Sequence, residues 1–258
     1  MHIHVAVVGL VRSFSDCLPS LNKRVLSFLP RFPGISISSS FHLSRTKVSL
    51  RNLRTNEFGA PEYAVEHLLG NQPYFFFETK ALREESKSLL ETILPSGEWL
   101  EGGGRNLQNY LEALTLLKSA NTQLRDFPAD AYLYVRPDLK MLDPFIPVPG
   151  MTISTQKVLT PAWGRWGGLN DRMAIVPQRY ANDYFSRLDT VVDFVNENGP
   201  FHPERHLAYA LRNIPNEARL RFEAIRVRTG GVLEDIDLKR LNASGLRGRI
   251  HARNLLSN

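Results

Sequence analysis

The first 43 residues show the pattern of a strand, a helix and a second strand, and this unit limits the folds that the chain can adopt. Residues 2–11 form an apolar run rich in β-branched side chains, which is typical of a buried strand. Residues 16–29 place apolar side chains on one helical face, and Pro30 ends that pattern. Residues 35–43 return to a strand pattern. A crossover of this length joins parallel strands with a right-handed connection. The opening therefore predicts an α/β domain.

The rest of the chain continues this pattern without an internal repeat or a linker. Further strands are predicted at 74–77, 131–135, 173–176 and 225–228, the last of them at a sheet edge. Helices are predicted at 61–69, 80–93, 106–120, 180–196 and 204–211. We therefore expect one Rossmann-like α/β domain over residues 1–230, in which helices flank a central, mostly parallel sheet. Residues 231–258 are expected to form a basic tail.

The composition excludes several classes of protein. With 43% hydrophobic and 22% charged residues, the chain fits a folded globular protein and not a disordered one. Its single cysteine, Cys17, excludes an internal disulfide and a cysteine-based metal cluster. The net charge of +6 suits an anionic ligand. The arginines are scattered, however, and no nucleic-acid-binding motif occurs, so we expect no nucleic-acid partner.

Two features of the sequence bear on localisation. No apolar segment is long enough to span a membrane, and the start lacks the basic region of a signal peptide. We therefore expect a cytoplasmic location, and the alternative is that the chain is the soluble part of a longer protein. After Asp237 the sequence has no acidic residues and several basic ones. This segment is either a solvated tail or a weak peripheral contact with an anionic membrane surface.

The sequence contains no GxGxxG fingerprint, no P-loop and no nucleophile elbow, so candidate site residues come from polar clusters at strand ends. The first cluster, Gly9 and Arg12, follows the first strand. Ligands of open parallel sheets bind beyond the carboxyl ends of the strands. Gly9 would let a ligand approach the backbone, and Arg12 would donate to a phosphate. The alternative is a turn glycine and a surface arginine.

The second cluster, Arg136-Pro137-Asp138, ends the strand at 131–135, because proline cannot continue a central strand. Asp138 suits a divalent cation or a ribose hydroxyl, and Arg136 suits a diphosphate. The alternative is a local Arg–Asp pair at the surface, which would contribute little.

The third cluster, residues 163–172, combines tryptophans, glycines and an Asn-Asp-Arg sequence before an apolar strand. Trp163 and Trp166 offer flat apolar faces for sugar rings, so we assign them, with Arg172, to acceptor binding. Asp171 would act as a general base or hold an acceptor hydroxyl. The alternative is a glycine-rich loop anchored in the core by its tryptophans.

The fourth cluster is Pro203-Glu204 at the start of a helix. Glu204 is a second candidate for the catalytic base. The alternative is an acid placed there by the helix dipole. His202 and His206 have helical spacing but lack the order of a zinc-binding HExxH motif, so they are not assigned to a metal.

The four segments, in this order, resemble a group of bacterial, viral and plant nucleotide-sugar glycosyltransferases with the GT-A fold. The matching segments are 5–14, with Gly-x-x-Arg, 134–139, with RPDL, 167–175, with GGxNDRxAI, and 203–204, with Pro-Glu. The resemblance covers roughly residues 1–230 and is loose over 44–104. It implies a GT-A-like domain and an enzyme that moves a sugar from a nucleotide diphosphate donor to a hydroxyl of a glycan or another acceptor.

The resemblance also implies site roles. Gly9 and Arg12 become nucleotide-binding residues, and Asp138 takes the place of the last aspartate of a DxD segment, which would hold Mn²⁺ or Mg²⁺. Arg136 stands where that segment has its first aspartate. Either one carboxylate holds a metal together with the diphosphate, or Arg136 supplies the positive charge itself. The missing aspartate favours an alternative function, a non-catalytic nucleotide- or carbohydrate-binding module with a degraded transferase site.

Overall fold

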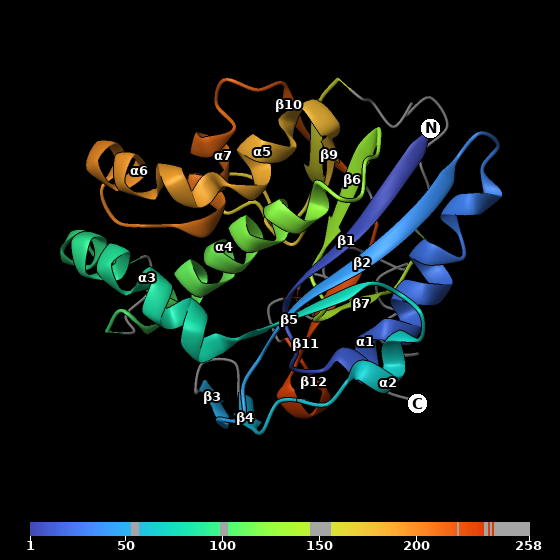
Figure 1. Ribbon diagram of the computed structural model, residues 1–258. Helices are drawn as coiled ribbons and strands as arrows, with labels where there is room; N and C mark the ends of the chain where they lie inside the picture. The colour runs from blue at the N-terminus through green and yellow to red at the C-terminus, as the bar shows by residue number, and fades with distance from the viewer. Residues whose placement is uncertain are drawn as a thin grey trace.

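The computed structural model describes residues 1–52, 57–98, 103–144, 156–220, 222–234, 237 and 239. Its centre is a seven-stranded sheet with helices on both faces (Figure 1). The strands are β1 (His2–Leu10), β2 (Ser36–Arg45), β5 (Tyr74–Glu78), β6 (Ala131–Val135), β8 (Val158–Pro161), β9 (Met173–Pro177) and β10 (Asn216–Leu220). Their spatial order is β10-β8-β9-β6-β1-β2-β5. The prediction of an α/β fold with helices flanking a mostly parallel sheet is confirmed.

Most strands of this sheet run in one direction. β1 lies between β2 and β6 and is parallel to both, and β5 is parallel to β2. β9 is antiparallel to its neighbours β6 and β8, whereas β10 is parallel to β8. Consequently β1, β2, β5, β6 and β8 all end at one edge of the sheet, and β9 begins there. We call this edge the carboxyl edge.

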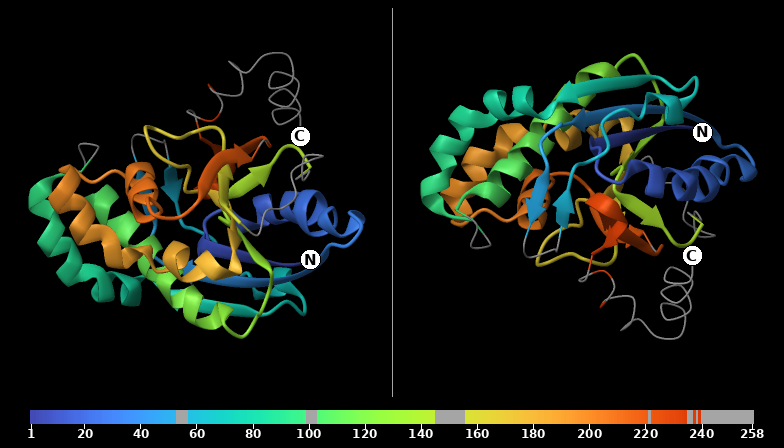
Figure 2. Two further views of the ribbon diagram at one scale, coloured as in Figure 1. Left: turned by 90° about the horizontal axis from the view of Figure 1, so that it is seen from above. Right: turned by 90° about the horizontal axis from the view of Figure 1, so that it is seen from below.

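Alternation along β1 divides the hydrophobic core into two layers. Val5 and Val7 pack on one face of the sheet, and Ala6 and Val8 pack on the other. The first face is covered by α1 (Phe14–Leu21), its π-helical continuation Asn22–Leu26, and α2 (Glu66–Leu69) (Figure 2). The second face is covered by α3 (Thr79–Ile93), α4 (Arg105–Leu124), α5 (Ala181–Phe185), α6 (Val191–Asn198) and α7 (Pro203–Ala210).

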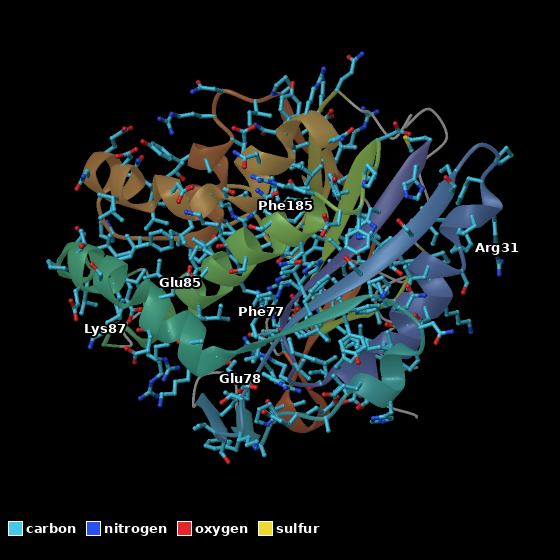
Figure 3. The ribbon with its side chains drawn as sticks, viewed as in Figure 1. Arg31, Phe77, Glu78, Glu85, Lys87 and Phe185 are labelled. Atoms are coloured by element: carbon cyan, nitrogen blue, oxygen red, sulfur yellow. The ribbon has the colours of Figure 1, made fainter. Side chains whose placement is uncertain are left out.

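The side chains follow these layers. Phe185 is fully buried in the second layer, where it packs edge-on against the rings of Tyr132 and Tyr134. Glu85 and Lys87 lie on the exposed face of α3, at the outside of the molecule (Figure 3). Helix α3 is therefore amphipathic, as its sequence periodicity predicts.

Two smaller sheets lie beside the carboxyl edge. β7 (Leu139–Met141), β11 (Ala224–Arg228) and β12 (Val232–Leu233) form one, in the order β12-β11-β7, and β3 (Leu50–Asn52) pairs with β4 (Glu57–Gly59). The prediction that 225–228 form an edge strand is wrong, because β11 is the middle strand of its sheet. The amide of Val227 donates to the carbonyl of Asp138 at 2.9 Å, which attaches β11 to the chain leaving β6.

Two helix predictions differ from the structure. The segment 61–69 is helical only over α2. The segment 180–196 is not one helix, since a 3₁₀ turn, Arg187–Thr190, separates α5 from α6. The buried guanidinium of Arg187 donates to the carbonyl of Tyr184, and the hydroxyl of Thr190 donates to the carbonyl of Arg187. These side-chain bonds occupy backbone acceptors at the break.

The first residues of the predicted tail belong to the domain. β12 pairs with β11, and Glu234 and Asp237 form ion pairs with arginines of the domain. The basic residues from Arg240 onward lie outside the described residues. Among the described helices, none combines the length and the apolar character that a membrane crossing requires.

Candidate active site at the carboxyl edge

The four polar segments identified in the sequence lie together at the carboxyl edge. They follow β1, follow β6, precede β9 and begin α7. The backbone amide of Arg136 donates to the carbonyl of Arg172 at 3.2 Å, which joins the second segment to the third. The amide of Leu169 donates to the carbonyl of Glu204 at 2.9 Å, which joins the third segment to the fourth. Residues far apart in the sequence therefore form one site.

Gly9 has a packing role in this arrangement. A Cβ atom on Gly9 would lie 2.6 Å from Cδ of Pro137, much closer than carbon atoms can approach. The absence of a side chain thus allows the segments after β1 and β6 to touch. The predicted contact between Gly9 and a nucleotide stays a prediction.

Asp138 is engaged by arginines. Nε and Nη2 of Arg136 donate to its two carboxylate oxygens at 2.9 and 2.8 Å, and Nε of Arg12 lies 3.7 Å from Oδ2. The Asp138 side chain is 1% exposed, so the expected alternative of a surface pair does not describe this contact. Burial alone would raise the pKa of the Asp138 carboxyl, but Arg136 and then Arg12 hold it far below its ordinary value.

The segment after β1 and the hairpin strand β4 extend these contacts. Nη1 of Arg12 lies 3.4 Å from Glu57, and Nη1 of Arg228 lies 3.7 Å from the same carboxylate. Glu57 also accepts hydrogen bonds from the amide and the hydroxyl of Thr229, at 3.1 and 2.9 Å. Arg228 forms a second pair with Glu234 at 2.5 Å. Glu57, on β4, therefore forms ion pairs both with Arg12, after β1, and with Arg228, on β11.

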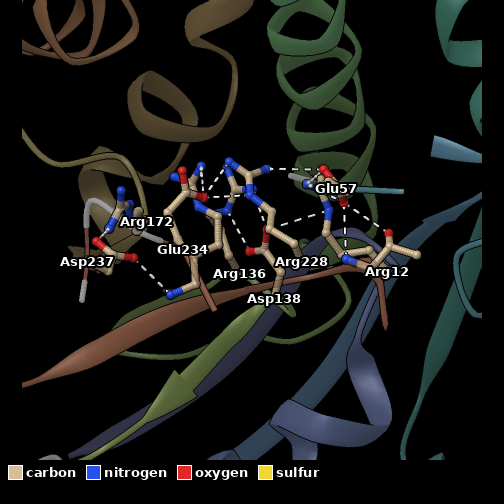
Figure 4. Close-up of polar contacts among 10 residues, drawn as sticks. Arg12, Glu57, Arg136, Asp138, Arg172, Arg228, Glu234 and Asp237 are labelled. Carbon is tan, nitrogen blue, oxygen red and sulfur yellow. Dashed lines mark hydrogen bonds and ion pairs between the residues drawn. The ribbon is translucent and has the colours of Figure 1, made fainter. Parts of the chain in front are cut away.

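A fourth carboxylate, Asp237, links the loop before β9 to β11. Nη1 of Arg172 donates to Asp237 at 2.5 Å, and the backbone amide of Arg226 donates to its other oxygen at 2.9 Å. The guanidinium of Arg226 lies 3.8 Å from Glu234. Figure 4 shows most of these contacts as one continuous network. We call the guanidinium groups of this network the arginine cluster: Arg12, Arg136, Arg172, Arg226 and Arg228.

Half of this network was not predicted. Sequence reasoning identified Arg12, Arg136, Asp138 and Arg172. It did not identify the other charged residues of the network, which are Glu57, Arg226, Arg228, Glu234 and Asp237. One signal was available. The alternation in 225–228 places Arg226 and Arg228 on the same face of a strand, but it does not indicate which residues pack against that face.

Gly168 brings the loop before β9 against the start of α7. A Cβ atom on Gly168 would lie 2.0 Å from the carbonyl oxygen of Glu204 and 2.2 Å from the carbonyl carbon. Since both atoms belong to the backbone, no side chain fits at this position without moving one of the two segments. This contact explains why position 168, in the third cluster, requires a glycine. It also brings Asp171, three residues later, close to Glu204.

Asp171 and Glu204 are neighbouring acidic residues whose charges act on each other. Burial, followed by the charge of Asp171, raises the pKa of Glu204 to about 8, and Arg172 and Arg226 oppose part of that shift. Glu204 therefore holds a proton near neutral pH. Asp171 is 7% exposed, and among the described residues no hydrogen bond or ion pair reaches its carboxylate. A largely buried carboxylate without a partner among the described residues suits a ligand hydroxyl.

Arg187 supplies a buried positive charge that interacts with the charge of Asp171. It is 2% exposed, donates to the carbonyl of Tyr184 at 2.8 Å and lies 4.6 Å from the centre of that ring. Among the described residues it forms no ion pair with a carboxylate, and Asp171 is the acid whose charge it senses. Arg187 was not predicted, because its place in an apparent helix gives no signal in the sequence.

The two tryptophans of the loop differ. Trp163 packs against the first core layer, and its Nε1 donates to the carbonyl of Phe222 at 2.8 Å, as the core-anchor alternative predicted. The guanidinium of Arg172 lies 5.3 Å from its ring centre. Trp166 is 54% exposed, and its backbone has a φ of +43°, a conformation that residues other than glycine rarely adopt. Trp166 is therefore the more accessible of the two rings, and the acceptor-binding role of both tryptophans stays a prediction.

No protein-family model and no curated protein sequence matches this chain. Similar solved structures include mouse xyloside xylosyltransferase 1, with 9% identity and a TM-score of 0.40 over 85% of each chain. The galactosyltransferase LgtC, in complex with donor and acceptor sugar analogues, has 12% identity and a TM-score of 0.43 over 84% of this chain and 73% of LgtC. A mutant of LgtC has 13% identity and a TM-score of 0.40, over 82% of this chain and 70% of that one. At such values the likeness concerns the arrangement of strands and helices and indicates no activity.

Proposed function

We propose that this protein is a GT-A-type glycosyltransferase, which moves a sugar from a nucleotide diphosphate donor to a hydroxyl of a glycan or another acceptor. One observation carries the proposal. The arginine cluster lies beside the Asp171–Glu204 pair. The charge of Asp171 contributes to the raised pKa of Arg136. The charges of Arg172 and Arg226 in turn lower the pKa of Glu204. Both groups lie at the carboxyl edge, where open α/β sheets bind ligands.

The donor would bind on the side of the arginine cluster. When the sugar leaves its donor, negative charge develops on the diphosphate, and fixed positive groups must stabilise that charge. Arg12 and Arg136 are held in place by Glu57 and Asp138, so they need little reorganisation when the charge appears. Fixed dipoles and charges of this kind provide a large part of catalysis in many enzymes.

The acceptor would bind on the side of Asp171. Because Glu204 holds the proton of the pair near neutral pH, Asp171 is the group that can accept the proton of an attacking hydroxyl. The protonated Glu204 would donate a hydrogen bond to the acceptor or the donor sugar. The exposed face of Trp166 would stack against an acceptor ring. This division assigns Asp171 as the base if the reaction inverts the anomeric configuration, and a retaining reaction would not require it.

A second candidate function is supported by one observation. The bidentate contact between Arg136 and Asp138 occupies the carboxylate that a DxD segment would offer to a metal. This feature favours a nucleotide- or carbohydrate-binding module without transferase activity. The two candidates differ in turnover, since only the enzyme would release free nucleotide diphosphate from a nucleotide-sugar.

A thermal-shift screen tests both candidates. UDP-, GDP- and dTDP-sugars and CMP-sugars are added with Mn²⁺ or with EDTA, and free nucleotide is then measured for each sugar that raises Tm. A ligand that binds the folded state alone raises Tm by mass action. Binding with turnover is expected for the transferase, and binding without turnover would support the module. No shift with any nucleotide-sugar at millimolar concentration would remove the main support for both. A cytoplasmic location, a lack of nucleic-acid partners and a membrane contact of the tail stay predictions.

A further inference from the structure

The residues at this edge do not fit the divalent cation that the resemblance implies. Such cations bind several oxygen ligands, of which carboxylates are the strongest. Both oxygens of Asp138 accept hydrogen bonds from Arg136, which stands at the position of the missing aspartate. Among the described residues, no group of three or more histidine, cysteine or acidic side chains is arranged to hold a metal ion.

We propose that the arginine cluster is a diphosphate-binding site that works without a divalent cation, its guanidinium groups taking the place of the metal. The inference rests on the proposed function for the identity of the ligand, a nucleoside diphosphate group. It concerns the charge that holds that ligand, which is a separate question from whether sugar is transferred.

The burial of the charged groups supports this inference. The four carboxylates of the network are almost completely buried, with side-chain exposures of 4% for Glu57, 1% for Asp138, 5% for Glu234 and 1% for Asp237. The arginines are more exposed, with 14% for Arg12, 21% for Arg136, 7% for Arg172, 16% for Arg226 and 7% for Arg228. Arg12, Arg136 and Arg226 are therefore the charged side chains of the network that reach solvent most. An ion that approaches from solvent meets N–H donors and positive charge, which attract a diphosphate and repel a metal cation.

The balance of charge points the same way. Five guanidinium groups share four carboxylates, so positive charge is in excess within the described network. Burial and the charges of Arg226 and Arg12 lower the pKa of Arg228 to about 9, despite its contact with Glu234. A bound anion would relieve this repulsion. The network also holds donors that it does not satisfy, because the buried Nε atoms of Arg12 and Arg226 have no hydrogen-bond partner among the described residues.

Binding of inorganic pyrophosphate, measured by calorimetry in EDTA and in Mn²⁺, tests the inference. We expect binding in EDTA that weakens as salt is added, and no gain from Mn²⁺, since the cation competes with the arginines for the same oxygens. Arg136→Gln and Arg226→Gln should each weaken binding about tenfold or more, because charge-assisted bonds to phosphate are lost. Arg219→Gln is the matched control, since Arg219 lies exposed on β10 and pairs with Glu217. It should bind as the unchanged protein does.

Asp138→Asn separates the two possible roles of this carboxylate by the sign of its effect. If Asp138 is a metal ligand, the variant loses binding that depends on Mn²⁺. If it is a buried counter-charge, the variant leaves the cluster more positive, so pyrophosphate binding in EDTA should stay equal or tighten. Thermal unfolding checks that the variant folds. If it does not, the comparison of EDTA with Mn²⁺ on the unchanged protein decides the question without any variant.

The outcomes distinguish this inference from the proposed function. Binding of pyrophosphate or of a nucleotide-sugar only when Mn²⁺ is present would overturn the metal-free site and leave the transferase standing. Binding of pyrophosphate in EDTA, without binding of any nucleotide-sugar, would support the anion site and overturn the proposed donor. An absence of pyrophosphate binding in both conditions would overturn the anion site.

Discussion

The contact between Gly168 and Glu204 gives a prediction that can be worked from distances. In Gly168→Ala, the new methyl group would lie 2.0 Å from the carbonyl oxygen of Glu204. The loop and the start of α7 have to separate by roughly 1.5 Å to reach an ordinary contact. Overpacking of this kind costs about 1–3 kcal/mol of folding free energy. A displacement of about 1 Å between catalytic groups costs on the order of 10²-fold in rate, so we expect turnover to fall by about that factor.

Two assays check this prediction. The first is turnover of the nucleotide-sugar that the thermal-shift screen identifies. The second needs no substrate: separating Asp171 from Glu204 removes the repulsion that helps to raise the pKa of Glu204, so stability should depend less on pH. Gly34→Ala is the control, because Gly34 has φ +77° and no atom within 4 Å of its Cβ position, at the other end of the sheet. It should lose stability through strain and keep full turnover. A Gly168→Ala variant with unchanged turnover and an unchanged pH dependence would refute the reasoning.

The remaining predictions concern single groups of the site. Asp171→Asn should lower turnover by about 10²–10⁴-fold and leave donor affinity, measured by calorimetry, nearly intact; lost donor binding with full turnover at saturation would contradict the acceptor-side role. Arg12→Ala should weaken nucleotide binding more than it lowers the free energy of unfolding in urea, and an equal loss in both would make Arg12 structural. Trp166→Ala should raise the KM for the acceptor without changing Tm, because the ring is exposed, and an unchanged KM would exclude the stacking role. Because the pKa of Glu204 is raised, this group holds a proton in the folded protein but not in the unfolded chain between pH 4.5 and about pH 8. The contribution of Glu204 to the free energy of unfolding is therefore complete below pH 4.5 and is lost as the pH rises to about 8. Urea unfolding at several pH values over that range measures this change, and Glu204→Gln should abolish this pH dependence.

The sequence predicted the positions of the site segments better than their contacts. Strand ends are marked by a change from apolar to polar residues, and the parallel strands β1 and β6 bring Arg12 and Arg136 to one edge by topology alone. Asp171 precedes β9 and reaches the same edge only because β9 runs antiparallel to β6, a direction that the sequence did not predict. The pattern could not supply Glu57 or Arg228. These residues come from short strands whose pairing depends on contacts between distant parts of the chain.

The dependence on distant contacts also explains why the single helix predicted over 180–196 is wrong. The apolar spacing over 180–196 is helical, and it predicted one helix. The structure divides it around Arg187, a charged residue that is almost completely buried. Periodicity treats a long charged side chain as an exposed one, and nothing local shows that this guanidinium turns inward toward Tyr184 and the charge of Asp171.

Asp138 shows how a correct position can carry a different role. Its place after β6 follows from Pro137, which ends the strand, and the resemblance to a DxD segment made it a candidate metal ligand. The same sequence puts Arg136 two residues earlier, within bidentate reach of the carboxylate. A carboxylate held in this way serves as a counter-charge that fixes a guanidinium, and the fixed guanidinium can then do what a metal does for a diphosphate, which is to neutralise charge at a defined point. Arg136 thus determines the chemistry of Asp138, and the two residues have to be interpreted as a unit.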